Sequence, residues 1–501
     1  MSPRPGLPVP AAARLRRRAQ AGFTMIELTV ALLSGLIVAM GIVGLSREAT
    51  QTFNDEARSG ASEAALRGAI DRLRADLERA GYMSTGNILL DPALALVPGG
   101  LAGAGNTPTY KPIVTVPPQT GMSGIQNLAS VFWVDSGSTT ANGLTLSASQ
   151  TPALTPDLIQ IAGNLSTSEQ FDVQSMPRTN TTCGSGGNII SLSANSPAMV
   201  RTLGGNVPIT AGNALANGQI LNNIFSPMPT APAIGSTARF LVRLIDRTAH
   251  TQYLATCPWT SAYPTAGVDA SNVPYVRVDG TNTPVLFSSA TGGGTTNLST
   301  IGGVGGFCSG CQINPVQVVQ WEITQVGAPD YEPAAYVGNL DFQSLTQTTD
   351  PTKYDLMRTL LDATGNLIPS TSEIVAEYAV DLAFAFTGDS GTNLVPAVPT
   401  KITSCAFDDI LCNTAWAQRV SSVFAAGQGP QRIRSIRARI MTRTQQTDRK
   451  GTITLSPAEY TTPPSQQFMY RYYISTATPT YARVRTVTTE VALPNQSRNF
   501  Y

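Results

Sequence analysis

Residues 22–45 decide the fold, and they read GFTMIELTVALLSGLIVAMGIVGL. From Phe23 to Leu45 the stretch is apolar except for Glu27 and a few small hydroxyl-bearing residues. As an α-helix it would extend about 34 Å at about 1.5 Å per residue, enough to cross a hydrocarbon core of about 30 Å. The stretch therefore predicts one transmembrane helix.

The charges that flank this stretch set its expected orientation. The first charge after it is Arg47, and no acidic residue stands among the basic ones before it. Positive charge collects on the cytoplasmic side of membrane proteins, so we expect a cytoplasmic N-terminus and an exported body. The preceding basic residues are Arg4, Arg14, Arg16, Arg17 and Arg18.

Two simpler interpretations compete for this stretch. A secretory signal peptide would end in small residues, a cleavage site and a turn, but residues 46–80 continue in helical register without a proline. A plain signal anchor leaves Glu27 unexplained, because a carboxylate within a span costs roughly 2.5–3.5 kcal/mol on insertion scales. Glu27 is therefore a candidate functional residue, and we expect it to have a partner.

The string GFTMIEL at residues 22–28 resembles the cleavage and methylation site of type IV prepilins. The resemblance implies that prepilin peptidase removes residues 1–22 as a leader, cutting between Gly22 and Phe23, and that Phe23 is N-methylated. It also implies a partner for Glu27: the new amino group of Phe23 on a neighbouring subunit. Because a buried carboxylate and ammonium offset each other's desolvation only when paired, this pair would set the register of subunits in a filament.

Helical periodicity continues past the apolar stretch. Apolar residues recur every three or four positions on one helix face, at Leu66, Ile70, Leu73 and Leu77. Charged residues occupy much of the other surface, at Arg67, Asp71, Arg72, Arg74, Asp76, Glu78 and Arg79. With Gly81 as its C-cap, we predict a helix over about residues 24–80, about 85 Å long. Its transmembrane half is residues 23–45, and its amphipathic half is residues 46–81.

A second resemblance appears where this helix is expected to end. Residues 69–82, AIDRLRADLERAGY, resemble the end of the first helix in PilW-type minor pilins and in the related J-type pseudopilins of type II secretion. Residues 83–85 read Met-Ser-Thr where many PilW-type proteins have a cysteine. Later segments resemble the same family in the same order: Leu356–Arg358, Val375–Phe386, Ile433–Ile440 and Arg483–Leu493.

The resemblance covers roughly residues 15–85 and 315–501 and implies an α+β, pilin-like fold. In that fold a long N-terminal helix packs on an antiparallel β-sheet head. The composition agrees with a β-rich exported body, because only 13% of residues are charged and 44 are glycine. We predict a head over residues 82–501 with a β- and loop-rich insertion at about residues 90–310. Further strands are predicted at residues 131–134, 157–161, 188–192, 238–245 and 316–323.

Six cysteines lie in the part expected to be exported, where disulfides form: Cys183, Cys257, Cys308, Cys311, Cys405 and Cys412. Six cysteines allow fifteen connectivities. Proximity in sequence favours Cys405–Cys412 and Cys308–Cys311, which leaves Cys183–Cys257. The pair at 308 and 311 also has the spacing of a redox motif or half a zinc site, but no second pair has zinc spacing. We therefore favour structural disulfides.

Arginines alternate along residues 432–443, which places several on one face of a strand. One interpretation is a basic patch for DNA or another anionic partner; the other is a solvated face paired with acids of neighbouring strands. We favour the second, because no aromatic residues are interleaved with the arginines. Similarly, Asp389–Asn393 and Asp408–Asp409 fit a calcium loop but are more typical of ordinary turns.

Little in the sequence indicates an enzyme. His250 is the only histidine, which excludes most histidine-based triads and histidine-ligated metals. Net charge is +1, and without the five N-terminal arginines the body is mildly acidic. We therefore expect no catalytic residues, no metal, no cofactor and no specific nucleic-acid partner.

Three functions are left open. The first is a minor pilin near the tip of a type IV pilus that promotes assembly, in a pilus serving adhesion or motility. Its partners would be prepilin peptidase, other minor and major pilins, the inner membrane and a tip adhesin. It would span the inner membrane with a periplasmic head, then move to the cell-surface pilus. The second is a type II secretion pseudopilin, and the third is a surface-binding module formed by the insertion.

Overall fold

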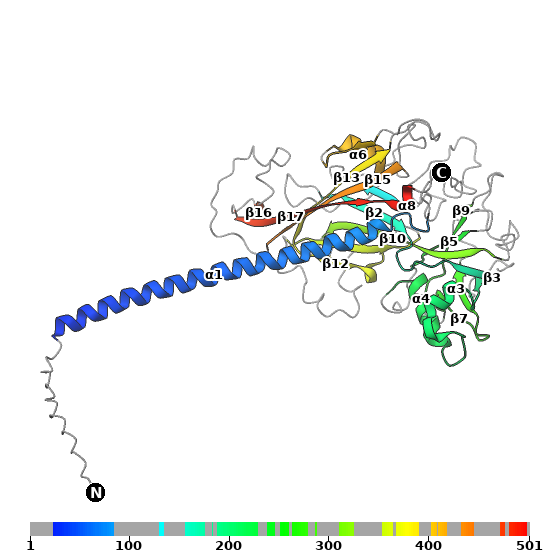
Figure 1. Ribbon diagram of the computed structural model, residues 1–501, viewed down its shortest axis with the longest axis horizontal. Coiled ribbons are helices and arrows are strands. Elements are labelled where there is room, and N and C mark those ends of the chain that lie inside the picture. The colour runs from blue at the N-terminus through cyan, green and yellow to red at the C-terminus, as the bar shows by residue number, and fades with distance from the viewer. Residues whose placement is uncertain are drawn as a thin grey trace, which may run out of the picture. The chain divides into compact units, whose positions relative to one another are not determined.

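The structure is a computed structural model of the 501-residue chain. It describes residues 24–84, 130–134, 156–175, 183, 188–228, 238–245, 251–259, 263–278, 286–287, 310–324, 353–363, 367–389, 402–407, 409–417, 432–444, 471–475 and 480–497. The chain divides into two compact units, Met1–Gly60 and Ala61–Tyr501. The described elements combine one long helix with antiparallel sheets, so the fold class is α+β (Figure 1).

The long helix α1 runs without a break over Met25–Glu78, which confirms the helix predicted for about residues 24–80. It ends where the sequence predicted. Gly81 has a φ of 70°, and its N–H donates to the carbonyl oxygen of Ala162 at 2.8 Å. Glycine adopts this left-handed conformation without the Cβ penalty of other residues.

The larger sheet is built around β10 (Gln312–Thr324), which pairs antiparallel with four other strands. Among the described strands, twelve belong to this sheet. The other eleven are β1 (Val131–Val134), β2 (Leu158–Gly163), β3 (Phe171–Ser175), β4 (Asn188–Leu192), β5 (Leu241–Ile245), β6 (Thr251–Ala255), β7 (Ala266–Val268), β8 (Pro274–Val278), β9 (Leu286–Phe287), β11 (Asp355–Leu361) and β12 (Glu373–Ala376).

The smaller sheet has five described strands in the order β14-β13-β15-β17-β16. It contains the segments Ile433–Ile440 and Arg483–Leu493, which resemble the PilW-type family. The five strands are β13 (Ala379–Asp389), β14 (Ile402–Ser404), β15 (Ile433–Arg443), β16 (Arg471–Ser475) and β17 (Thr480–Ala492). The short α6 (Ile410–Ala417) contacts β1 and β13, and α8 (Pro494–Ser497) follows β17.

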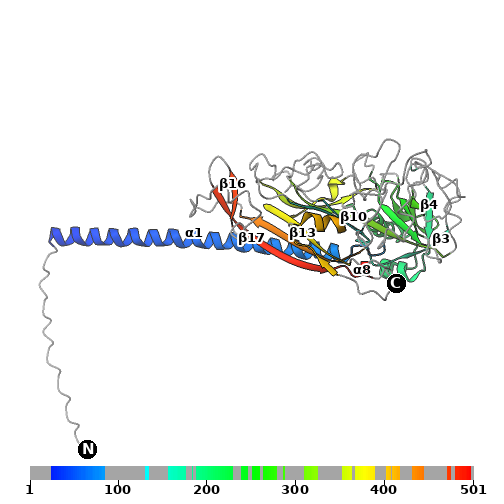
Figure 2. The same ribbon diagram turned by 90° about the horizontal axis from the view of Figure 1, so that it is seen from above.

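The main core lies between the Ala61–Glu78 part of α1 and both sheets. The predicted stripe Leu66, Ile70, Leu73 and Leu77 is buried. These side chains join one hydrophobic cluster with Trp321 of β10, Phe384 of β13 and Ile436 of β15. Figure 2 shows strands of the smaller sheet beside this part of the helix. Burial of this stripe holds the amphipathic half of α1 on the head.

A second hydrophobic core lies within residues 171–313, and the part of the head built around it is called the lobe here. Strands β3, β4, β5 and β8 bury apolar side chains against α3 (Pro197–Leu203) and α4 (Ala214–Phe225). Short 3₁₀ helices lie at Gly204–Asn206 and Pro369–Thr371. β1 and β2 lie within the range predicted as an insertion, about residues 90–310, and contribute Trp133 and Ile159 to the main core.

The segment Val375–Phe386 resembles the central strand of the PilW-type family, but the expectation of a single strand there is wrong. It is interrupted at Glu377 and Tyr378, and the two pieces belong to different sheets, β12 pairing with β11 and β13 with β15. Tyr378 has a φ of 54°, and a left-handed residue cannot continue a strand. The chain therefore crosses from one sheet to the other at this turn.

Gly163, at the end of β2, is expected to be intolerant of any side chain. A Cβ there would overlap the carbonyl oxygen of Arg79, where α1 ends. We expect Gly163→Ala to lower the free energy of unfolding by about 1–3 kcal/mol or more, because backbone must move to relieve the overlap. Urea denaturation of the full chain in detergent measures this.

Gly68→Ala is the matched control for that change. Nothing lies within 4 Å of a Cβ built on Gly68, which stands inside α1. Alanine replaces glycine in a helix interior with a gain of roughly 0.5–1 kcal/mol. Equal effects of the two substitutions would show that the approach of β2 to the end of α1 is not tight.

Candidate functional site

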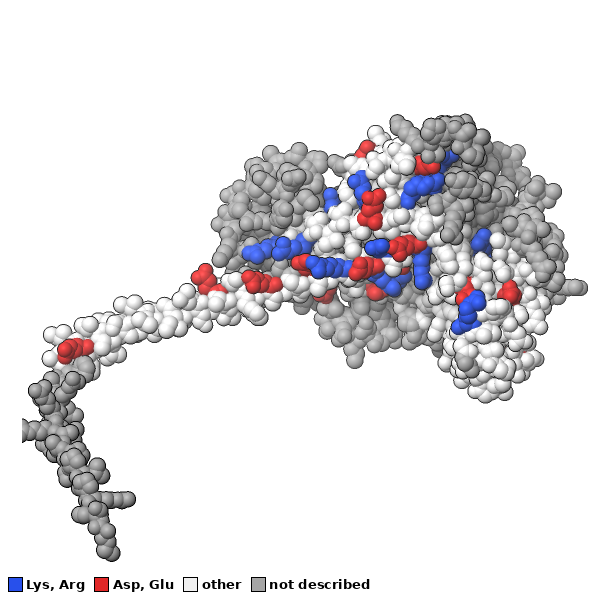
Figure 3. Space-filling model, in the orientation of Figure 1, with Lys and Arg blue, Asp and Glu red and all other residues white. Residues whose placement is uncertain are grey.

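The first part of α1 exposes its apolar side chains. The segment Met25–Asn54 contains an 18-residue window with a mean hydropathy of 2.4 and is long and apolar enough to cross a membrane, as a single-pass anchor or as a signal sequence. Met25 is 84% exposed and Leu45 is 71% exposed. On the face shown in Figure 3, this part of α1 carries little charge, whereas blue and red side chains gather over the head. Such a surface needs a lipid or protein partner in water.

Glu27 lies in the first turn of α1 and caps it. The backbone N–H of Thr24 donates to Glu27 Oε2 at 3.1 Å, and the Thr24 hydroxyl donates to the same oxygen at 3.0 Å. In return, the N–H of Glu27 donates to Thr24 Oγ1 at 3.3 Å. This reciprocal arrangement is a capping box. A negative charge here also interacts favourably with the N-terminal end of the helix dipole.

The capping box gives Glu27 hydrogen bonds within its own helix. Other hydroxyls of the segment also turn inward: Thr29 Oγ1 donates to the carbonyl oxygen of Ile26 at 2.9 Å and Ser34 Oγ to that of Ala31 at 3.0 Å. The carboxylate of Glu27 is the only charged group between Thr24 and Ser46. The predicted processing residues Gly22 and Phe23 lie outside the described residues, so the predicted pairing of Glu27 with Phe23 stays a prediction.

A second polar cluster joins α1 to the head and is called the helix anchor here. Asp76 accepts from Arg358 Nε at 2.7 Å and from Arg358 Nη2 at 3.2 Å. It also accepts from Trp321 Nε1 at 3.0 Å. All three residues are buried. The anchor thus connects α1 to β10 and β11 by charge-assisted hydrogen bonds.

The helical periodicity predicts Asp76 on the charged surface away from the apolar stripe, and that prediction is wrong. Asp76 is only 4% exposed. It precedes Leu77 and stands three residues after Leu73, so it borders the apolar stripe. The resemblance of residues 69–82 and 356–358 to one family drew attention to both segments, but it gave no pairing between Asp76 and Arg358. The spacing of three residues between Leu73 and Asp76 is the sequence feature that could have predicted the burial of Asp76.

The anchor extends toward solvent through Glu373 of β12. Glu373 Oε2 lies 3.9 Å from Arg358 Nη1 and 3.4 Å from Arg72 Nη2. Glu373 and Arg72 are both about half exposed, so this outer pair is screened and contributes little. The buried Asp76–Arg358 pair is the part whose loss matters.

Two of the three predicted disulfides are present among the described residues. Cys183 is bonded to Cys257, and Cys405 to Cys412. Cys311 is also disulfide-bonded. Cys308 lies outside the described residues, so the Cys308–Cys311 pairing stays a prediction.

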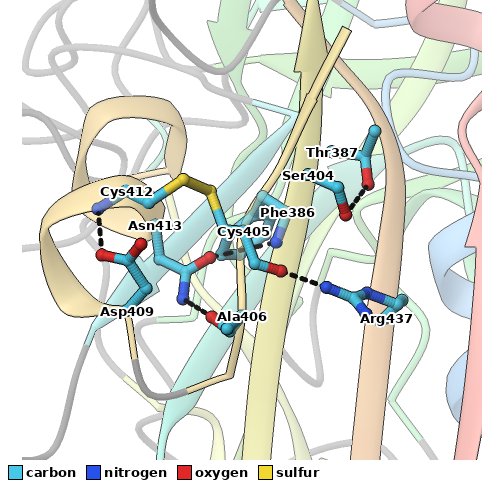
Figure 4. Close-up of a disulfide and its surroundings, with 9 residues drawn as sticks. All are labelled: Phe386, Thr387, Ser404, Cys405, Ala406, Asp409, Cys412, Asn413 and Arg437. Atoms are coloured by element: carbon cyan, nitrogen blue, oxygen red, sulfur yellow. Dashed lines mark hydrogen bonds between the residues drawn. A yellow bond between two sulfur atoms is a disulfide. The ribbon is translucent and has the colours of Figure 1, made fainter.

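Figure 4 shows how the Cys405–Cys412 bond fastens α6 to the smaller sheet. The buried Asn413 accepts from the N–H of Phe386 at 3.1 Å and donates to the carbonyl oxygen of Ala406 at 2.8 Å. Asp409 accepts from the N–H of Cys412 at 3.0 Å. Arg437 donates to the carbonyl oxygen of Cys405. The Cys405–Cys412 disulfide is therefore surrounded by hydrogen bonds of the fold, as expected for a structural disulfide.

Two arginines of β15 form ion pairs with acids of the neighbouring β13, as the second interpretation of that strand predicted, but their side chains are mostly buried and not solvated. Arg439 Nη2 lies 2.9 Å from Asp381 Oδ2, and Arg434 Nη2 lies 3.3 Å from Asp389 Oδ2. Asp381 is fully buried, and burial raises the pKa of its carboxyl against the opposing effect of Arg439. Arg437 and Arg439 also lie over the ring of Phe407. Arg434, Arg437 and Arg439 therefore all make contacts within the head.

The calcium-loop candidates have other roles where they are described. Asp389 binds Arg434, and Asp409 caps the first turn of α6. Among the described residues, no group of three or more His, Cys, Asp or Glu side chains could hold a metal ion. Asp408, Asn393 and His250 lie outside the described residues.

Comparisons of the chain with protein-family models, with curated proteins and with solved structures find no match. The proposal that follows therefore depends on the chain's own residues. These are the prepilin-like string at residues 22–28, the exposed apolar part of α1 with Glu27, and the helix anchor.

Proposed function

We propose that this chain is a minor pilin of a type IV pilus, incorporated near the tip and promoting pilus assembly. The observation that carries the proposal is the single carboxylate, Glu27, in the otherwise uncharged apolar part of α1 before Arg47, whose large side chains are exposed. A membrane anchor needs no such charge, and an inserted charge costs free energy. A contact between the Glu27 carboxylate and an ammonium group during filament assembly would account for this charge.

The order of features along the chain supports the same proposal. An arginine-rich segment, Gly22 and Phe23 precede the helix. The Ala61–Glu78 part of α1 is then fixed to antiparallel sheets by the apolar stripe and the helix anchor. In this account the helix supplies the filament contacts and the head supplies the surface. The cell would hold the chain in the inner membrane, head outward, before assembly.

A type II secretion pseudopilin would use the same helix in the same way. The helix and its attachment to the head support a pilus and a secretion pseudopilus equally. We prefer the pilus because residues 356–358, 433–440 and 483–493 resemble PilW-type proteins. The lobe adds a further role, because its separate core allows it to be presented as a binding surface on the subunit.

Cleavage of the leader tests the proposal. Co-expression of the full chain with a prepilin peptidase should shorten it by residues 1–22 and give a new N-terminus at Phe23. Gly22→Val should block this cut, because a branched side chain then stands at the scissile bond. Cleavage beyond Leu45 would instead identify a secretory signal peptide, and an uncut chain would identify a plain membrane anchor. Either result contradicts the proposal.

A further inference from the structure

A partly buried ionisable cluster lies at the turn between β12 and β13 and is called the latch here: Lys353, Asp355, Glu377 and Tyr378. The turn is the point where the chain crosses between the sheets. Its Tyr378 is held at a φ of 54°, a conformation that costs a non-glycine residue free energy and persists only where surrounding contacts enforce it. The contacts that enforce it come from both sheets.

Asp355, at the start of β11, holds the turn from one side. It is 1% exposed, and its Oδ1 accepts from the backbone N–H of the strained Tyr378 at 3.1 Å. From the other side, the N–H of Arg443 in β15 donates to the carbonyl oxygen of Tyr378 at 2.9 Å. The backbone of Tyr378 is thus hydrogen-bonded by an element of each sheet.

Two cations also lie over the Tyr378 ring. Lys353 Nζ is 5.4 Å from the ring centroid, and the Arg443 guanidinium is 4.8 Å from it. Cation–π contacts of this kind strengthen when they are removed from water, and Lys353 and Arg443 are both buried. The left-handed turn therefore has backbone and side-chain restraints.

The charges of the latch are not evenly matched. Lys353 Nζ lies 2.7 Å from Glu377 Oε1 but 3.6 Å from Asp355 Oδ2. Glu377, half exposed, is therefore the closer counter-ion of Lys353. Asp355 remains deeply buried with weaker compensation, although it keeps a hydrogen bond from the Tyr378 N–H. A buried carboxylate in this position favours its neutral form.

We propose that Asp355 makes the latch sensitive to protons. With Asp355 neutral, the Tyr378 turn is held closed; with Asp355 ionised, the crossover between the two sheets loosens. The titratable and charged groups that face Asp355 are Lys353, Glu377, Tyr378 and Arg443. Because Glu377 and Tyr378 directly follow β12, loosening also weakens the contact of Glu373 with the helix anchor. The inference concerns the head alone and holds whether or not the chain is a pilin.

The direction of the pH effect follows from burial. Burial raises the pKa of Asp355 from 3.8 to about 6, against the opposing effects of Lys353 and the Tyr378 N–H. Burial disfavours the charged form of Lys353 as well, but Glu377 and Asp355 outweigh it and its pKa is raised, so Lys353 stays charged. Asp355 binds its proton more tightly when the turn is closed than when it is open. The closed state is therefore favoured below about pH 6 and loses this advantage as the pH rises through 6.

Amide hydrogen exchange of the full chain in detergent tests the latch. Protection of the Tyr378 amide, corrected for the intrinsic pH dependence of exchange, should be about tenfold greater at pH 5 than at pH 7.5. In Asp355→Asn, whose amide still accepts the Tyr378 N–H but does not titrate, protection should be equal at both pH values. Glu377→Gln should make the change smaller than tenfold, because Glu377 raises the pKa of Asp355 and its loss leaves Lys353 to pair with Asp355.

Two outcomes overturn the inference. One is wild-type protection at Tyr378 that does not change between pH 5 and 7.5, a result that needs no variant to fold. The other is an Asp355→Asn variant that keeps the wild-type pH dependence. Amides in the centre of β15, such as that of Ala438, serve as the internal reference, because they are buried away from the turn.

Discussion

Replacing Asp76 with alanine is expected to lower the free energy of unfolding by about 3–5 kcal/mol, because the buried Arg358 guanidinium loses the carboxylate that accepts its hydrogen bonds. The N–H of Trp321 loses its acceptor as well. Both groups are too buried for water to replace Asp76 easily. Urea denaturation of the full chain in detergent gives the value.

Asp71→Ala is the control for this prediction. Asp71 stands on the same helix but is exposed, and a surface change of this kind is expected to stay within about 0.5 kcal/mol. The double substitution Asp76→Leu with Arg358→Met should recover most of the loss, since a buried ion pair can be replaced by packed apolar side chains at little cost. A loss at Asp76 no larger than at Asp71 would refute the helix anchor.

The second large effect is expected at Glu27, on filament assembly. Glu27→Gln removes the charge but keeps a side chain that can complete the capping box, because glutamine serves there as well as glutamate. Loss of a buried ion pair costs about 3–5 kcal/mol, so the amount of the chain in sheared filaments should fall at least about tenfold. Its amount in the membrane should not change.

Thr24→Ala separates assembly from capping. It removes the Thr24 hydroxyl from the capping box but keeps the carboxylate of Glu27. A lost N-cap costs about 1 kcal/mol, so incorporation into filaments should fall only a few-fold. If Glu27→Gln assembled normally while Thr24→Ala did not, Glu27 would be a helix cap and its proposed contact with Phe23 would be wrong.

Local patterns were sufficient to predict the elements that carry strong periodicity. The helix was predicted from its apolar stripe, and strands β1 and β4 have the predicted bounds, Val131–Val134 and Asn188–Leu192. The helix α3 was missed although its signal was available. Ser196 caps it through the N–H of Met199, and Pro197 begins it, a typical helix start.

Pairings between distant residues could not be predicted in this way. Asp76 and Arg358 are 282 positions apart, and nothing in either segment names the other. The split of residues 375–386 between two sheets depends on contacts of Tyr378 with Asp355 and Arg443, which only the folded chain brings together. The candidate site shows the same limit, because the motif at residues 22–28 names Glu27 while its partner is expected on another subunit.

Mass spectrometry of filaments sheared from the cell surface tests the central claim most directly. The account predicts peptides of this chain in the filaments, with an N-terminal peptide that begins at methylated Phe23. A processed chain confined to the membrane fraction would favour a secretion pseudopilus or a priming role instead. A mature chain that still carries residues 1–22 and is absent from filaments would contradict the account and leave a membrane-anchored β-rich protein.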